Sequence, residues 1–134
     1  MPTDTAGDAG QQYHTNQIMY LAKSISYADG ATKVYTLGVI PPRAVVIRGG
    51  VVVTTAFNAG SGNVIDIGTS SDDDGFATDL ALGTIGVITA DEMATTNDAY
   101  STSAVTITAT LALTGTAATA GAGVAWVEYL LADR

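Results

Sequence analysis

The residues of this 134-residue chain best suited to bind a cation are three consecutive carboxylates, Asp72, Asp73 and Asp74. Gly75 follows them, and Ca²⁺ loops combine carboxylate oxygens with a glycine at the sharp turn. The D-x-D-x-D-G spacing of such a loop is absent, however, and Ala81 stands where its last carboxylate would be. The pattern therefore favours a solvated acidic loop over a cation site, and we assign no metal ligands.

The other carboxylates that could form a catalytic pair in a hydrolase are Asp66, Asp79, Asp91 and Glu128. Glycoside cleavage needs two carboxyl groups held about 5 Å or about 6.5–9.5 Å apart, and nothing in the spacing of these four fixes such a pair. The single histidine, His14, has no neighbouring base or nucleophile, and neither a G-x-S-x-G motif nor a phosphate-binding loop is present. We therefore expect no enzymatic activity, no catalytic residue and no cofactor.

Composition narrows the possible partners. Thirteen acids against five bases give a net charge of −8, which repels phosphate backbones and anionic membranes. No run of 18 apolar residues is present, and the N-terminus lacks the basic and apolar regions of a signal peptide. Only 13% of the residues are charged and 47% are apolar, so we expect part of the surface to be covered in an oligomer or larger assembly.

The elements that would position these residues are β-strands. Val105, Ile107, Ala109, Leu111 and Leu113 alternate with small or hydroxyl residues, which is the period of a half-buried strand. Further strands are predicted over residues 17–27, 33–37, 64–67, 84–89 and 124–131. Residues 43–55 predict a long strand bent at its paired glycines, which we expect to form a hairpin with 64–67. A corner is predicted over 38–42, a short helical turn over 77–82, and a polar connection with a brief helical turn near residues 91–93 over 90–100.

About eight such strands predict an all-β fold, an antiparallel β-sandwich of the jelly-roll kind, as a single domain over residues 17–134. Residues 1–16 are polar and aperiodic, which predicts a flexible N-terminal arm. In the last strand Trp126, Glu128 and Leu130 share one face, while Ala125, Val127, Tyr129 and Leu131 share the other. Both faces are largely apolar, so this strand is expected to be central or to lie at a subunit contact.

Trp126 and the six tyrosines permit two interpretations. Aromatic faces can form a platform for sugars, which would make the chain a carbohydrate- or receptor-binding module of a virion fibre or tail. Packing in the core and between the sheets is the role that we favour for Trp126.

Two stretches carry a resemblance, VVVTTAFNAGSGNVIDIG followed by SSDDDGFATDLAL, and the terminal TGTAATAGAGVAWVEYLLA. In composition and in the order of these sequence stretches, residues 39–132 resemble small virion proteins of tailed bacteriophages, closest to head decoration (cement) proteins. The resemblance implies a homotrimer of β-sandwich or jelly-roll subunits on the outer surface of the capsid. The partners it implies are the major capsid protein and further copies of the chain, with no nucleic acid and no membrane.

The resemblance also implies an arm that reaches onto neighbouring capsid subunits, although residues 1–16 match no defined capsid-binding motif. The candidate docking residues in that arm are Thr3, Asp4, Gln11, Gln12, Tyr13 and His14. The candidate subunit-contact strand is represented by Trp126, Tyr129 and Leu131.

Overall fold

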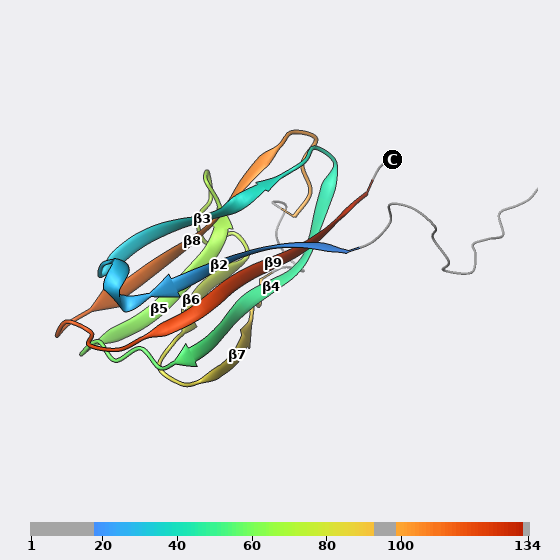
Figure 1. Cartoon of the computed structure of the whole chain (residues 1–134). Coiled ribbons are helices and arrows are strands. Elements are labelled where there is room, and N and C mark those ends of the chain that lie inside the picture. The colour runs from blue at the N-terminus through green and yellow to red at the C-terminus, as the bar shows by residue number, and fades with distance from the viewer. Residues whose placement is uncertain (1–17, 93–98, 133–134) are drawn as a thin grey trace, which may run out of the picture.

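The computed structural model of the chain describes residues 18–92 and 99–132, and its elements there are strands and one short 3-10 helix (Figure 1). The strands are β2 (Met19–Ser26), β3 (Thr32–Ile40), β4 (Ala44–Thr55), β5 (Gly62–Thr69), β6 (Ala77–Ala81), β7 (Gly86–Thr89), β8 (Val105–Thr114) and β9 (Ala122–Leu131), and the helix η1 spans Tyr27–Asp29. The prediction of an all-β fold with about eight strands is confirmed. In the described part of the chain, no helix has the length and hydropathy needed to span a bilayer.

The strands form two four-stranded antiparallel sheets that pack face to face. One sheet, called here the β9 sheet, has the order β2-β9-β4-β7, and the other, the β8 sheet, has the order β3-β8-β5-β6. The pairing is nested, because β2 pairs with β9, β3 with β8, β4 with β7 and β5 with β6. A long antiparallel ribbon rolled onto itself gives this order, which is that of a jelly roll and confirms the predicted sandwich.

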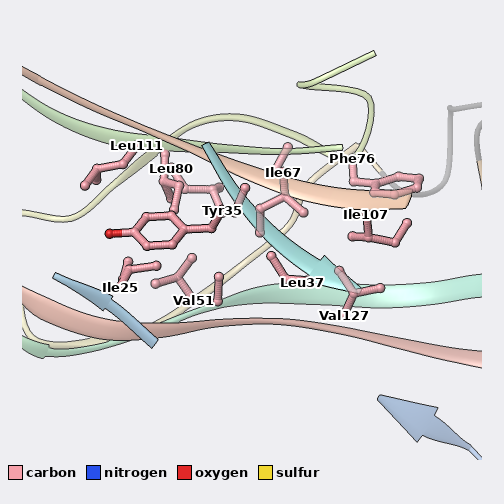
Figure 2. Close-up of a cluster of buried hydrophobic side chains, with 14 of the residues drawn as sticks. Ile25, Tyr35, Leu37, Val51, Ile67, Phe76, Leu80, Ile107, Leu111 and Val127 are labelled. Atoms are coloured by element: carbon pink, nitrogen blue, oxygen red, sulfur yellow. The ribbon is translucent and has the colours of Figure 1, made fainter. Parts of the chain in front are cut away.

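The core lies between the sheets and follows the predicted alternation. Ile107, Ala109 and Leu111 of β8 are fully buried, while the residues between them face outward. Figure 2 shows side chains from the β8 sheet, such as Ile67 and Leu111, pointing toward Val51 and Val127 of the β9 sheet. Burial of such a side chain contributes about 1.5–3 kcal/mol, and the described residues have no disulfide that could substitute for it.

The predicted hairpin between residues 43–55 and 64–67 is wrong. The long strand is present as β4, but it pairs with β9 and β7, whereas β5 pairs with β8 and β6 in the opposite sheet. The connection crosses between the sheets and is fixed by Asn63, whose side chain accepts from the Ala59 N–H at 2.7 Å and donates to the Ala59 carbonyl at 3.0 Å. The irregularities of β4 lie around Ile47 and Thr54, not at the paired glycines.

The predicted helical turn over 77–82 is a strand, β6. Ala77 and Leu80 are both buried, at a spacing of three that resembles a helix period. The spacing arises because the pairing of β5 with β6 shifts register between Ile65 and Ile67. An extra residue at such a bulge breaks the period of two that identifies a strand. In the same way, residues 38–40, predicted as part of a corner, extend β3, and the turn that leads into β4 is confined to 41–43.

Candidate interaction surfaces

The outer face of the β9 sheet is apolar and has no net charge, and we call it the neutral face. Ala125 and Val127 of β9 are buried, so Val124, Trp126 and Glu128 between them point outward. Directly opposed residues of antiparallel strands share a face. The register therefore adds these outward residues from the neighbouring strands: Tyr20, Ala22 and Ser24 of β2, Arg48, Gly50 and Val52 of β4, and Val87 and Thr89 of β7.

Trp126 lies at the middle of the neutral face. Its cross-strand neighbours are Ala22 on β2 and Gly50 on β4, which are too small to cover an indole ring. Trp126 is half-buried and lies on the opposite side of β9 from the core, so the preferred interpretation of Trp126 as a core residue is wrong. The next row across the sheet is Val124, Val52 and Val87.

The charges of the neutral face cancel. Arg48 and Glu128 stand opposite one another in the register of β4 and β9, and the Arg48 Nε donates to the Glu128 carboxylate in an ion pair. Their side chains are 64% and 24% exposed, so the pair contributes little to stability, about 0–1 kcal/mol. Its consequence is electrostatic, because it leaves this face of an acidic chain without a net charge.

The predicted contact strand is divided between the two sides of β9. Tyr129 and Leu131 point inward and pack against the core, whereas Trp126 points outward. This division follows the face assignment made from the alternation, and β9 lies centrally between β2 and β4 as expected. Trp126 is therefore the member of the set that lies on the outer surface.

The outer face of the β8 sheet carries hydroxyls and carboxylates, and we call it the hydroxyl-acid face. Thr106, Thr108 and Thr110 project from β8, with Thr36 and Asp66 opposite them on β3 and β5. An open groove of about 440 Å³ runs along this face, lined by Val34, Thr36, Thr69, Ser70, Ser71, Asp73, Thr106, Thr108 and Thr110. The threonines that alternate through residues 106–110 are the sequence pattern that indicates this groove, and no function was predicted for them.

Two hydroxyls of the groove differ in their bonding. The Thr108 hydroxyl is buried and donates to the Thr69 carbonyl at 3.3 Å. The Thr110 Oγ1 is also buried, but it has no hydrogen-bond partner within the described residues. An unsatisfied buried hydroxyl costs free energy, so Thr108 stabilises the groove and Thr110 does not.

Carboxylates gather beside this groove. Gly68 permits the loop over 69–75 to lie against β5, because a Cβ there would collide with the backbone of Asp72 and Asp73. One carboxylate oxygen from each of Asp72, Asp73 and Asp74 lies within 4.8 Å of the others. The three residues form a loop, as predicted, and the clustering itself is what acidic surface loops commonly show.

Asp66, a carboxylate of this region, has a raised pKa. Burial raises its pKa, and the nearby charges of Asp79, Asp73 and Asp74 act in the same direction. The Asp79 N–H donates to the Asp66 Oδ1 at 2.6 Å and opposes them. A carboxylate among carboxylates makes this face a source of negative potential.

Two of the four carboxylates considered for hydrolysis, Asp66 and Asp79, are brought together, and the other two are not. Asp66 and Asp79 are neighbours on the hydroxyl-acid face, Asp91 follows β7 in a loop, and Glu128 lies on the neutral face across the sandwich. The candidate arm residues, from Thr3 to His14, lie outside the described residues.

The nested strand pairing and the continuous core between two sheets define a jelly-roll sandwich. No protein-family model matches the chain, and no curated protein matches its sequence.

Two solved phage capsid structures contain chains of similar fold. A chain in the acidic stable capsid structure of Helicobacter pylori bacteriophage KHP30 superposes with a TM-score of 0.63 at 18% identity, over 89% of this chain and 92% of that one. A chain in the cyanophage Pam1 capsid asymmetric unit superposes with a TM-score of 0.58 at 15% identity, over 95% and 94%. At such identities the likeness establishes the shared fold.

Proposed function

We propose that this chain is a non-enzymatic structural protein of a phage virion. The observation that carries the proposal is the shared jelly roll, because chains of phage capsid structures match nearly the whole of it from end to end. A protein that stabilises a shell requires broad contact surfaces, and both outer faces of this sandwich are broad sheets.

Within the virion, the role we propose is that of a head decoration or cement protein on the outer capsid surface. It would bind the lattice of the major capsid protein as a homotrimer, with residues 17–134 as one domain and 1–16 as a docking arm. The low share of charged residues supports this role, because surfaces covered by neighbours need few charges. An arm that orders on docking would add contacts at the moment of binding.

The test is a reconstitution. Purified chain is mixed with undecorated capsids and imaged by cryo-microscopy, and we expect added density at the threefold positions of the shell. Absence of density at saturating protein would reject the decoration role. Deleting residues 1–16 should reduce occupancy, and unchanged occupancy would reject the docking role of the arm while leaving the rest of the proposal intact.

The second candidate is a carbohydrate- or receptor-binding module. The observation in its favour is Trp126, whose indole lies on the outer face between Ala22 and Gly50. A glycan array and a Ca²⁺ titration separate the two candidates. Binding to a defined glycan, lost in Trp126→Ala, would favour the module, and silence in both assays would remove it.

A further inference from the structure

We infer that the neutral face is the surface through which copies of this chain contact one another, with Trp126 at the centre of the contact. The inference rests on the proposed homotrimer and adds to it that each copy turns this face toward the threefold axis, where it contacts both neighbours. Three properties of the neutral face support it: the exposure of its apolar side chains, its lack of net charge and its area.

The neutral face exposes large apolar side chains. Tyr20 is 71% exposed and Val87 is 65% exposed, and they lie on either side of the half-buried Trp126 and Val52. Exposed apolar side chains that gather around an aromatic residue mark a candidate interaction site. The indole between two small neighbours is an aromatic anchor of the kind enriched at interface centres.

Charge selects a further copy of the chain as the occupant. Each copy carries a net charge of −8, so two copies repel unless the surfaces that meet are neutral. The hydroxyl-acid face holds Asp66 with the acids at 72–74 and 79 around it, and two such faces would oppose like charges. The neutral face has Arg48 paired with Glu128, so copies that meet there bring no unpaired like charges into contact.

The size of the face is adequate. The spacing of strands and the rise per residue give a four-stranded face of this length roughly 500 Å² in projection. Because side chains corrugate the surface, its accessible area exceeds the projection and approaches about 800 Å², which in a homotrimer is divided between the two neighbours of each copy. Figure 1 shows β2, β9 and β4 side by side along this layer.

The test uses Trp126, which is the only tryptophan of the chain and therefore reports on this face alone. Full-length chain is measured by light scattering and by acrylamide quenching of tryptophan fluorescence across a dilution series. We expect association at micromolar concentration, with quenching that rises as the copies separate on dilution.

A matched pair of variants locates the contact. Val87→Glu adds a negative charge to the neutral face, and Val39→Glu adds the same charge at a similarly exposed valine, 57% against 65%, on the hydroxyl-acid face. We expect Val87→Glu to raise the dissociation constant by about tenfold or more, since a buried like charge is costly, and Val39→Glu to leave it within about twofold. Ser24→Glu, at an exposed position opposite Val124, repeats the test if Val87→Glu does not fold.

Three results would overturn the inference. They are an oligomer in which Trp126 stays fully accessible to acrylamide, a chain that remains monomeric, and Trp126 that becomes shielded only when capsids are added. A chain that remains monomeric would also contradict the proposed homotrimer, whereas binding to the capsid is tested separately by the reconstitution with undecorated capsids.

Discussion

The two outer faces of the sandwich are built alike and carry different chemistry. In both sheets one set of alternate residues fills the core, and the other set is free of that constraint. The β8 sheet places hydroxyls and carboxylates at its free positions, whereas the β9 sheet places Trp126 and a row of valines there. The outward-facing residues of a sandwich are not constrained by core packing, so they are the ones that can vary to give each face its own binding properties.

The two faces also differ in how their side chains are stabilised. A face of threonines and aspartates satisfies its polar groups with water and with local hydrogen bonds, such as that of the Thr108 hydroxyl. A face of valines and an indole forms no such hydrogen bonds, and the free energy falls when another surface covers it and removes its apolar area from water. The following changes would test this contrast.

The largest effect is expected at the glycines of the two faces. A Cβ at Gly50 would collide with the Ile88 carbonyl in the paired strand β7, so Gly50→Ala should lower the free energy of unfolding by about 2–3 kcal/mol. A Cβ at Gly68 would collide with the backbone of Asp72 and Asp73, in a loop that the Thr69 N–H holds through the Asp72 carbonyl, so Gly68→Ala should also cost about 2–3 kcal/mol. Urea unfolding measures both, and a cost below about 1 kcal/mol at either position would show that the opposing backbone moves away.

A smaller effect is expected from breaking the neutrality of the β9 sheet. Arg48→Gln leaves Glu128 unpaired, so self-association should weaken about five- to tenfold, as measured by analytical ultracentrifugation. Adding Glu128→Gln restores neutrality and should restore most of the affinity. If the single and double variants associate equally, the ion pair does not set the charge of the contact.

The two threonines of the groove should respond in opposite ways to the same change. Thr108→Val removes the donor to the Thr69 carbonyl and should cost about 1 kcal/mol. Thr110→Val replaces a buried hydroxyl that has no partner, so stability should be unchanged or raised. Chemical denaturation of both variants decides the matter, and a loss in Thr110→Val equal to that in Thr108→Val would show that Thr110 is satisfied.

The smallest effect is expected from the charge of Asp66. Because its pKa is raised in the folded chain, the folded state binds the proton more tightly, and the stability this gives is present at low pH and is lost as pH rises through that pKa. Asp66→Asn keeps an acceptor for the Asp79 N–H and should raise the thermal midpoint slightly at pH 7. The gain should vanish below about pH 4, where the unfolded carboxyl is also protonated.

The control for this variant is Asp91→Asn, which removes the same charge from an exposed loop outside the carboxylate cluster. In Asp91→Asn, the difference between the thermal midpoints at pH 7 and at pH 3 should be the same as in the parent chain. A stability gain of Asp66→Asn that persists at pH 3 would assign the effect to something other than ionisation.

Much of the local structure could be predicted. The alternation of residues 105–113 identified both a strand and its buried face, and the division of β9 into two faces was also confirmed. Predictions failed where a local pattern imitates another element. Ala77 and Leu80 have a helix-like spacing because a register shift interrupts the pairing of β5 with β6.

The hairpin predicted between residues 43–55 and 64–67 failed for a different reason. Two strands close in sequence are expected to pair, but here the short connection crosses from one sheet to the other. Trp126 was misassigned because a large aromatic residue in an apolar strand resembles a core residue, and only the burial of Ala125 and Val127 shows which side is inside.

The class of structure is readable from the chain alone, since side-chain alternation and turn residues are local properties. The net charge and the lack of cysteine are also properties of the sequence. Which strands share a sheet follows only from the folded arrangement, because such pairing joins residues far apart in the chain. Arg48 and Glu128 meet across 80 residues, and Asp66 meets Asp79 across a bulge, so the neutral face and the acidic one exist only once the jelly roll has closed.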